Sequence, residues 1–282
     1  MKEAPSTYPA LPLEDEFSDV VAKALRGHEL SWERLAGELG QDPEGFRAAF
    51  SSPSPLLFPL WERVAERLSL HPKKLQEAAC QQWRPPSVPA IPGLHQFVSP
   101  FRAWTVNAWL VHCPVTKEGW VIDTGTDASE LLQFVEEQAV YLQALAFTHT
   151  VHPDHTSEVD RIGAATGLRR LLGPEGEPSV RKSAALRRDQ VYSLGTLEIE
   201  IRSTPGHSPD GVTLVVAGLA RPVALVGDAL YAGSLGAPLD HYGKLLSGVR
   251  REIFSLPDDT LLCPGHGPVT TVAQEKAHNP FF

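Results

Sequence analysis

Apolar residues recur at helical spacing over the first part of the chain, from about residue 13 to residue 82. The pattern is clearest at residues 20–25, 32–39 and 60–68. Ser31 is a predicted N-cap, and the pair Asp42-Pro43 is typical of a helix start. Residues 83–93 carry prolines at 85, 86, 89 and 92, which exclude a helix or a central strand. The sequence therefore predicts a helical domain over residues 1–82 and a linker over residues 83–93.

Beyond the linker the pattern changes to short apolar runs bounded by glycine, proline and aspartate, which is typical of strands. The runs lie at residues 104–112, 120–122, 142–147, 197–201, 212–216, 223–226 and 261–263. Helical stretches separate them at about residues 129–138, 158–166 and 241–254. We therefore expect an α/β or α+β domain over residues 94–282, with helices that cover the sheets.

Composition limits the class of protein and of partner. The 282 residues carry a formal net charge of −9, which argues against a general affinity for nucleic acid or an anionic membrane. The first residues lack the pattern of a signal peptide, and no apolar run approaches the roughly 18–20 residues of a membrane-spanning helix. Three scattered cysteines without a C-x-x-C pair argue against a disulfide framework and favour a reducing cytoplasm.

Histidines and aspartates that follow predicted strands carry the candidate chemistry. The densest cluster is THTVHPDHT, residues 148–156, which contains His149, His152, Asp154 and His155. Three imidazoles and a carboxylate cannot all be buried without compensation, so they must face water or bind something. Neutral imidazole and carboxylate together suit Zn²⁺, Fe or Mn²⁺ rather than Ca²⁺.

Three further motifs also place a polar residue in the loop after a strand. STPGHS contains His207, ALVGDAL contains Asp228 and LLCPGHGP contains His266, each beside a glycine that lets the backbone turn sharply. In this order the four motifs resemble the metallo-β-lactamase superfamily, whose pattern is T-H-x-H-x-D-H, a lone His, a bridging Asp and a last His. VIDTG, with Asp123, resembles its early structural aspartate. The resemblance covers about residues 94–282 and implies an α+β fold, a four-layer αββα sandwich, here preceded by a small all-helical domain.

The resemblance also implies two divalent metal ions, with Zn²⁺ preferred and Fe or Mn as alternatives. Its ligand sets are His149, His152 and His207 for one ion, Asp154, His155 and His266 for the other, and Asp228 as the bridge. Asp154 is implied to be catalytic as well, because its carboxylate would orient the attacking hydroxide.

The first pair of histidines departs from the superfamily spacing. The pattern has one residue between them, whereas Thr150 and Val151 both lie between His149 and His152. We favour an extra residue that bulges out of the loop, since a loop absorbs one residue at small cost and His149 then stays the first ligand. The alternative register puts Thr150 in that position, which would leave the first site weak and the protein mononuclear.

The end of the chain resembles one branch of the superfamily. The segment PGHGPVTTVAQEKAHNPFF, with Asn279-Pro280-Phe281, is similar to the end of short glyoxalase II-like (hydroxyacylglutathione hydrolase-like) proteins. This similarity implies a small-molecule thioester or ester that a metal-bound hydroxide hydrolyses. Residues 234–239, SLGAPL, differ from the C-G-R-T-D-F of the mononuclear iron persulfide dioxygenases, an alternative within the superfamily. They also have Ala237 where the glyoxalase II-like branch often has Arg.

Residues 31–75 resemble a helix-turn-helix of the phage-repressor type. The recognition-helix region, residues 42–50, offers Arg47 beside Asp42 and Glu44, and residues 1–84 hold ten Lys and Arg against thirteen Asp and Glu. Phosphate contacts supply much of DNA affinity, so we expect a packing module or homodimer contact rather than nucleic-acid binding. The alternative from another class is a DNA-binding regulator whose metal domain senses a ligand.

Overall fold

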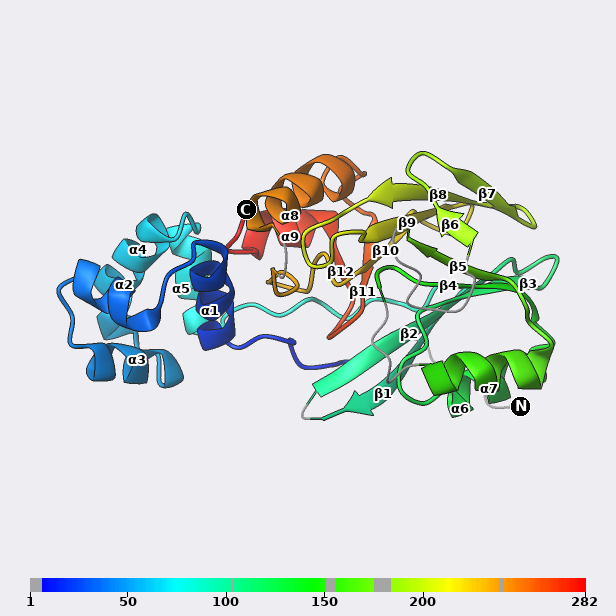
Figure 1. Ribbon diagram of the computed structural model, residues 1–282, viewed down its shortest axis with the longest axis horizontal. Coiled ribbons are helices and arrows are strands. Elements are labelled where there is room, and N and C mark those ends of the chain that lie inside the picture. The colour runs from blue at the N-terminus through cyan, green and yellow to red at the C-terminus, as the bar shows by residue number, and fades with distance from the viewer. Residues whose placement is uncertain (1–6, 103, 151–155, 175–183, 239–240) are drawn as a thin grey trace.

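The computed structural model describes residues 7–102, 104–150, 156–174, 184–238 and 241–282. Its first part is helical, as predicted, and lies to one side of the rest of the molecule (Figure 1). The elements are α1 (Phe17–Gly27), α2 (Trp32–Glu38), α3 (Pro43–Ser51), a 3-10 turn (Pro55–Leu57), α4 (Phe58–Arg67) and α5 (Pro72–Ala79). No helix among the described residues is both long and apolar enough to cross a membrane.

The local sequence explains where two of these helices begin. Ser31 Oγ accepts a hydrogen bond from the backbone N–H of Arg34 at 3.2 Å, and Asp42 Oδ2 accepts one from Gly45 at 2.8 Å. Both predicted N-caps are thus confirmed. The apolar faces of the helices meet around the rings of Phe17, Phe50 and Trp61, whose centroids lie 4.7–5.2 Å apart.

The described residues after position 93 form two mixed sheets that pack face to face (Figure 1). The first has the order β1 (Leu94–Phe101), β2 (Trp104–His112), β3 (Glu118–Ile122), β4 (Tyr141–Ala146), β5 (Leu171–Pro174), β6 (Ala184–Leu186). The second has the order β12 (Thr270–Thr271), β11 (Leu261–Pro264), β10 (Val223–Gly227), β9 (Val212–Ala217), β8 (Leu197–Ser203), β7 (Val191–Leu194). Between them lies an apolar core to which Trp109 and Trp120 contribute from one sheet and Ile199 and Leu225 from the other.

Helices cover the outer face of each sheet. They are α6 (Ser129–Glu137) and α7 (Thr156–Thr166) on the first sheet, and α8 (Tyr242–Gly248), a π-helical turn (Val249–Ile253) and α9 (Val272–His278) on the second. Leu131 and Ile162 belong to the core of the first pair of layers, Leu245 and Val272 to that of the second. The fold is therefore the predicted four-layer αββα sandwich.

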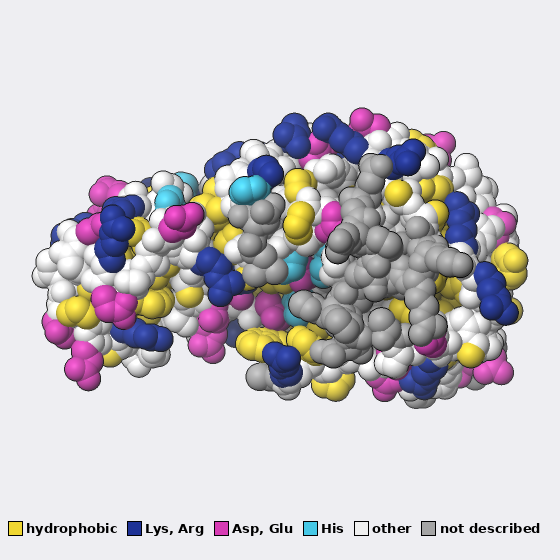
Figure 2. All heavy atoms as spheres, viewed as in Figure 1, with side chains coloured by type: hydrophobic (Ala, Val, Ile, Leu, Met, Phe, Trp, Pro, Cys, Tyr) yellow, Lys and Arg dark blue, Asp and Glu magenta, His cyan; other side chains and the backbone are white. Residues whose placement is uncertain are grey.

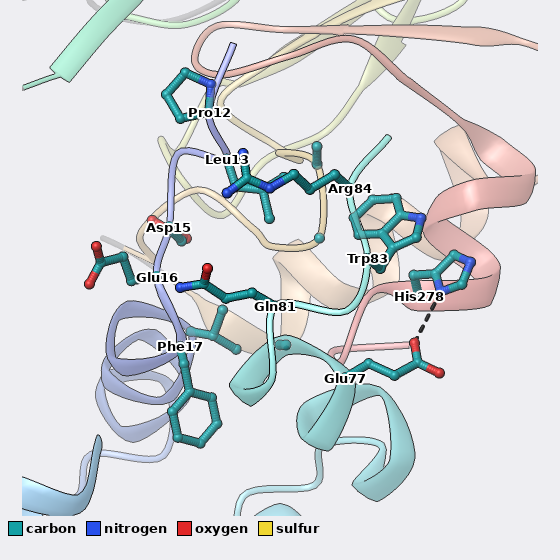
Figure 3. Close-up of a pocket in the computed structure, with 14 residues that line it drawn as sticks. Pro12, Leu13, Asp15, Glu16, Phe17, Glu77, Gln81, Trp83, Arg84 and His278 are labelled. Atoms are coloured by element: carbon teal, nitrogen blue, oxygen red, sulfur yellow. Dashed lines mark hydrogen bonds and ion pairs between the residues drawn. The ribbon is translucent and has the colours of Figure 1, made fainter. Parts of the chain in front are cut away.

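The helical part and the sandwich share one apolar core. Buried residues of α1, α4 and α5 belong to the same cluster as Ala224 of β10, Leu245 of α8 and Phe281 near the end of the chain. The Lys74 ammonium adds hydrogen bonds to the carbonyl oxygens of Lys276 and Phe282, at 2.7 and 2.8 Å. A cavity that is open to solvent lies at this junction, beside Leu13, Trp83 and His278, with about 790 Å³ of empty space (Figure 3). The domain boundaries at residues 82 and 93 stay a prediction.

Candidate metal centre

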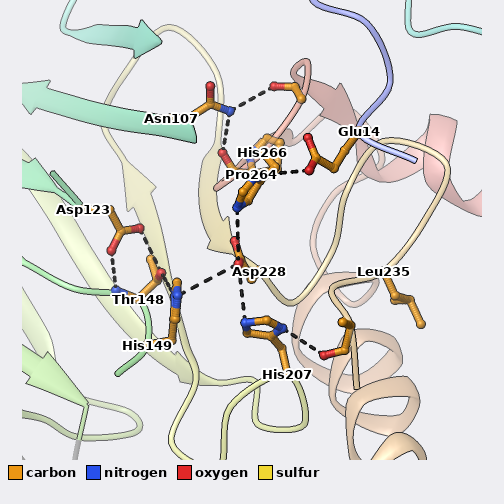
Figure 4. A network of polar contacts seen from close by, with 12 residues as sticks. Glu14, Asn107, Asp123, Thr148, His149, His207, Asp228, Leu235, Pro264 and His266 are labelled. Carbon is orange, nitrogen blue, oxygen red and sulfur yellow. Dashed lines mark hydrogen bonds and ion pairs between the residues drawn. The ribbon is translucent and has the colours of Figure 1, made fainter. Parts of the chain in front are cut away.

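Four of the seven predicted ligands lie among the described residues, and the structure brings them together (Figure 4). They are His149 after β4, His207 after β8, Asp228 after β10 and His266 after β11. The common point is Asp228 Oδ2, which lies 3.4 Å from His207 Nε2, 3.7 Å from His266 Nε2 and 4.0 Å from His149 Nε2. The other three predicted ligands, His152, Asp154 and His155, lie outside the described residues.

The sheet topology explains why residues so far apart in sequence meet. Strands β10 and β11 are parallel neighbours with Gly227 opposite Pro264, so the loops that follow them, with Asp228 and His266, lie side by side. The loop after β4 joins the second sheet where the backbone N–H of Val212 donates to the carbonyl of Thr148 at 2.7 Å. The predicted ligands therefore come from both sheets at one end of the sandwich.

Hydrogen bonds fix which nitrogen of His207 and of His149 carries the proton. His207 Nδ1 lies 2.9 Å from the carbonyl oxygen of Ala237, which can only accept, so Nδ1 is the donor. The Thr148 hydroxyl donates to Asp123 Oδ2 at 2.9 Å and therefore accepts from His149 Nδ1, also at 2.9 Å. In the neutral imidazoles both Nε2 atoms thus present a lone pair towards Asp228.

The third imidazole has a carboxylate at ion-pair distance from its Nδ1, without an aligned hydrogen bond. His266 Nδ1 lies 3.2 Å from Glu14 Oε1, and its Nε2 faces Asp228. Lone pairs and a carboxylate oxygen that face one point repel one another unless a cation lies between them. Ligand atoms of a tetrahedral zinc ion lie roughly 3.3 Å apart, since each bond is about 2.0–2.1 Å. The donor set of His149, His207 and Asp228, all within 4.8 Å of one another, fits a divalent cation.

The charges around Asp228 keep its carboxylate ionised. Burial alone would raise the pKa of Asp228, but the three histidines and the Tyr231 hydroxyl outweigh burial and lower the pKa below its usual range. Burial lowers the pKa of His207, which therefore stays neutral at pH 7. Burial also acts to lower the pKa of His266, but the carboxylates of Glu14 and Asp228 reverse the effect and raise it.

The structure places His149, and not Thr150, beside Asp228. The exposed Thr150 hydroxyl instead donates to Asp210, whose carboxylate also accepts a hydrogen bond from Ser208 at 2.5 Å. This is the arrangement that an extra residue bulging from the loop would produce. Val151, the other residue of the predicted bulge, lies outside the described residues.

Two glycines let the backbone approach Asp228 closely. A Cβ at Gly236 would lie 1.7 Å from the Asp228 carbonyl oxygen, and a Cβ at Gly265 would lie 2.2 Å from its Oδ1. Any other residue at Gly236 would clash with the Asp228 backbone, and any other residue at Gly265 would clash with its carboxylate. Gly265 precedes a predicted ligand and was expected to matter, whereas Gly236 was not singled out by its sequence context.

A cavity of about 670 Å³ opens beside the four residues. Its lining combines the apolar side chains of Phe101, Val106 and Phe147 with the ligand cluster and Asp123. Its described lining residues include no lysine or arginine. Figure 2 shows histidine side chains at the surface in the hollow between the two parts of this face.

Three residues that support the cluster were not among the predicted site residues, although Tyr231 was considered as either a pocket or a core residue. Asn107 Nδ2 donates to the carbonyls of Pro264 and Gly267, at 3.0 and 2.9 Å, and so holds the loop that carries His266. Tyr231 packs its ring on His266, with centroids 5.4 Å apart. Asn107 gave a signal, since it is a polar residue within a strongly apolar run. Glu14 gave none, because its neighbour in space lies at the other end of the chain.

Comparison with known proteins agrees with this geometry. A sequence model of the metallo-beta-lactamase superfamily matches residues 102–266. A probable metallo-hydrolase of Streptococcus pyogenes is 30% identical over 57% of this chain and 80% of its own length. The hydroxyacylglutathione hydrolase GloC of Haemophilus influenzae is 29% identical over 59% of this chain and 88% of its own.

A solved structure is similar as well. The crystal structure of ETHE1 from Myxococcus xanthus has a TM-score of 0.57 and 25% identity, over 66% of this chain and 83% of that one. The superfamily model spans more than half of this chain, and the Streptococcus relative is matched over most of its length. The chain therefore belongs to the metallo-β-lactamase superfamily, which implies that it binds divalent metal ions.

Proposed function

We propose that this protein is a metal-dependent hydrolase of thioesters or esters, of the glyoxalase II-like kind. The observation that carries the proposal is the convergence of three imidazole Nε2 atoms on Asp228 Oδ2, in a cleft that apolar side chains also line. The proposed ligands are His149, His152 and His207 for one ion, Asp154, His155 and His266 for a second, and Asp228 for both. Zn²⁺ is the preferred metal.

When bound, such ions lower the pKa of a water molecule towards roughly 7 and polarise a carbonyl oxygen. The residues of the chain do the rest. Asp228 stays ionised among the histidines and offsets the positive charge in the cleft. Asp154 is proposed to accept a hydrogen bond from the attacking water and so to orient it towards the carbonyl carbon.

The cleft favours an acyl group with an apolar portion. Phe101, Val106 and Phe147 would contact that portion and exclude water from the reacting carbonyl. The named activity of the Haemophilus relative supports a thioester as the bond that is cleaved. Glutathione as the carrier has less support, since no described lining residue offers a cation for its carboxylates.

An iron dioxygenase is a second candidate, because two observations favour it. The described cluster of His149, His207 and Asp228 is a set of two imidazoles and one carboxylate, which is also the ligand set of mononuclear non-haem iron enzymes. The similarity to ETHE1 from Myxococcus xanthus is the other observation. The two functions differ in their metal, in metal stoichiometry and in their need for O₂.

Metal analysis of the purified protein, followed by assays with thioester, ester and lactone substrates, tests the proposal. We expect two equivalents of metal, hydrolysis without O₂, and a loss of activity of about 100-fold or more in Asp154→Asn. Asp189→Asn is the matched control, because Asp189 is an exposed loop residue with φ of +63°, which asparagine also tolerates. One equivalent of iron together with O₂ consumption on a persulfide would overturn the hydrolase and favour the dioxygenase.

The helical part is proposed to be a packing module rather than a DNA reader. It shares an apolar core with the sandwich, and Figure 2 shows acidic and basic side chains interspersed on its visible face. A gel-shift assay over a range of salt concentrations tests this role, and a specific, salt-dependent shift would support the DNA-binding regulator instead.

A cytoplasmic location is also part of the proposed function, since the three cysteines are free.

A further inference from the structure

The segment that precedes α1 reaches the candidate metal centre from outside the sandwich. Its residue Glu14 extends towards His266, where Oε1 lies 3.2 Å from Nδ1 (Figure 4). The Glu14 side chain is only 12% exposed, and that of His266 is 17% exposed. A carboxylate this shielded from water needs a partner, and the nearby His266 Nδ1 is itself buried without a hydrogen-bond partner among the described residues. The two atoms are at ion-pair distance, and a small turn of either side chain aligns Nδ1 to donate to the carboxylate.

The backbone of the same segment packs against the loop that carries His266. Gly267 has a φ of +71°, and a Cβ there would lie 3.2 Å from the Glu14 backbone nitrogen and 3.6 Å from the Pro12 carbonyl oxygen. The two stretches of chain are thus in direct contact, although more than 250 positions separate them. This contact holds the Glu14 backbone at a fixed distance from the imidazole.

Neighbouring residues anchor the segment to a second loop of the centre. Asp15 accepts hydrogen bonds from Lys23 of α1, at 2.5 Å, and from Ser234. The Lys23 ammonium also donates to the carbonyl oxygen of Leu235 at 2.6 Å. Ser234 and Leu235 belong to the stretch between Asp228 and Ala237. Figure 3 shows Leu13 and Asp15 on the wall of the junction cavity, between α1 and this stretch.

We propose that Glu14 is a positioning residue of the metal centre. Its carboxylate accepts the Nδ1 proton of His266, orients the ring, and makes Nε2 a stronger donor to the ion that His266 helps to hold. Carboxylates behind metal-bound histidines have this effect in other proteins, and their loss weakens metal binding by about 10–100-fold. The inference rests on the proposed role of His266 as a metal ligand.

Two separate parts of the chain would then form the metal centre. The sandwich supplies the described candidate ligands, and the segment before the helices supplies the group that orients one of them. Residues 12–23 contact the His266 loop through Glu14 and the loop after Asp228 through Asp15 and Lys23. The segment therefore contributes to metal affinity as well as to packing.

Zinc affinity, measured by competition with a chromophoric chelator, tests the inference on the full chain. We compare the wild type with Glu14→Ala, Glu14→Gln and His266→Ala. Glu16→Gln is the control, because Glu16 is an exposed carboxylate two residues along that lines the junction cavity. Melting curves of the metal-free variants identify any general loss of folding. The absorption of the Co²⁺-loaded protein reports the environment of the ion without any assay of activity.

We expect zinc affinity to fall about 10–100-fold in Glu14→Ala and less in Glu14→Gln, whose amide oxygen still accepts the Nδ1 proton. The Co²⁺ spectrum should change in both, and Glu16→Gln should match the wild type. Wild-type affinity in both Glu14 variants, with a loss in His266→Ala, would overturn the role of Glu14 alone. Wild-type affinity in His266→Ala would overturn the proposed ligand itself. If Glu14→Ala does not fold, wild-type affinity and spectrum in Glu14→Gln overturn the inference.

Discussion

The Thr148 hydroxyl donates to Asp123 Oδ2 at 2.9 Å, and the backbone N–H of Thr148 donates to Oδ1 of the same carboxylate at 3.0 Å. This pair of bonds leaves the hydroxyl oxygen free to accept from His149 Nδ1. Asp123 therefore sets the tautomer of a candidate ligand that it does not touch. Asp123, which resembles the early structural aspartate of the superfamily, thus orients His149 through the Thr148 hydroxyl.

Thr148→Val keeps the shape of this side chain and removes the hydroxyl. We expect zinc affinity to fall by about 10-fold or more, because His149 loses the acceptor that holds its tautomer. Stability should fall by about 1–3 kcal/mol, since a carboxylate oxygen of Asp123 loses a donor. Thr260→Val is the control: Thr260 is buried and its hydroxyl has no hydrogen-bond partner among the described residues. Equal zinc affinity in both variants would contradict this role of the Thr148 hydroxyl.

Gly236→Ala tests the close approach of backbone to Asp228. The new Cβ would clash with the Asp228 carbonyl oxygen at 1.7 Å, so the loop must shift and the ligand cluster must open. We expect a large loss of bound metal and of stability. Gly37→Ala is the matched control, because a Cβ in α2 would meet nothing within 4 Å and alanine favours a helix by up to about 1 kcal/mol. Normal metal content in Gly236→Ala would show that the loop tolerates the shift.

Metal should stabilise the folded chain through Asp228. Zinc at about 100 times its dissociation constant adds about 2.7 kcal/mol to the free energy of unfolding. We expect a higher melting temperature for the wild type with zinc, a return to the lower value after EDTA, and a much smaller change in Asp228→Asn. Differential scanning fluorimetry measures the shifts. An equal response of wild type and variant would exclude Asp228 as a ligand.

The buried Glu275 should make stability depend on pH. Burial raises the pKa of Glu275 to about 7, from 4.5, against the lowering effect of hydrogen bonds from Asn279, Thr270 and Gly233. A raised pKa favours the folded state below pH 4.5, and this contribution is lost as pH rises towards 7. It amounts to about 3 kcal/mol in all.

Glu275→Gln should remove this dependence. The amide can accept from Gly233 and Asn279 and donate to the Thr270 hydroxyl, which reverses its own role. We expect the variant to be more stable than the wild type at pH 8 and close to it at pH 4.5, as measured by urea unfolding at both values. A constant difference between the two proteins across this range would mean that Glu275 does not titrate there.

The sequence predicted those helices and strands that have a clear apolar pattern within their own residues. β2 coincides with an apolar run over residues 104–112, and four loop positions after strands point to residues that meet in space. β1 was missed because Phe97 and Val98 lie among polar residues, and its strand conformation depends on pairing with β2. The helix expected over residues 241–254 is present but ends in a π-helical turn, which apolar periodicity does not reveal.

The supporting residues of the centre were less predictable than its ligands. Histidine and aspartate beside glycine, after a strand, indicate a metal site by residue type. A glutamate in a polar segment does not indicate any one role, because glutamate is common at protein surfaces. Glu14 and His266 meet only because α1 packs against the same core as α8 and the end of the chain. Such a contact depends on the whole tertiary structure, and no local spacing encodes it.

The single apolar core that spans both parts of the molecule has a consequence for its folding. Phe17 and Trp61 belong to the same buried cluster as Leu235 and Ile253. Unfolding of either part would therefore expose buried apolar residues of the other part to water. Calorimetry should record one endotherm with equal calorimetric and van't Hoff enthalpies. Removal of the leading helices would then expose the apolar residues that they cover, and the remaining sandwich would aggregate. The helices are in that case required for the stability of the sandwich.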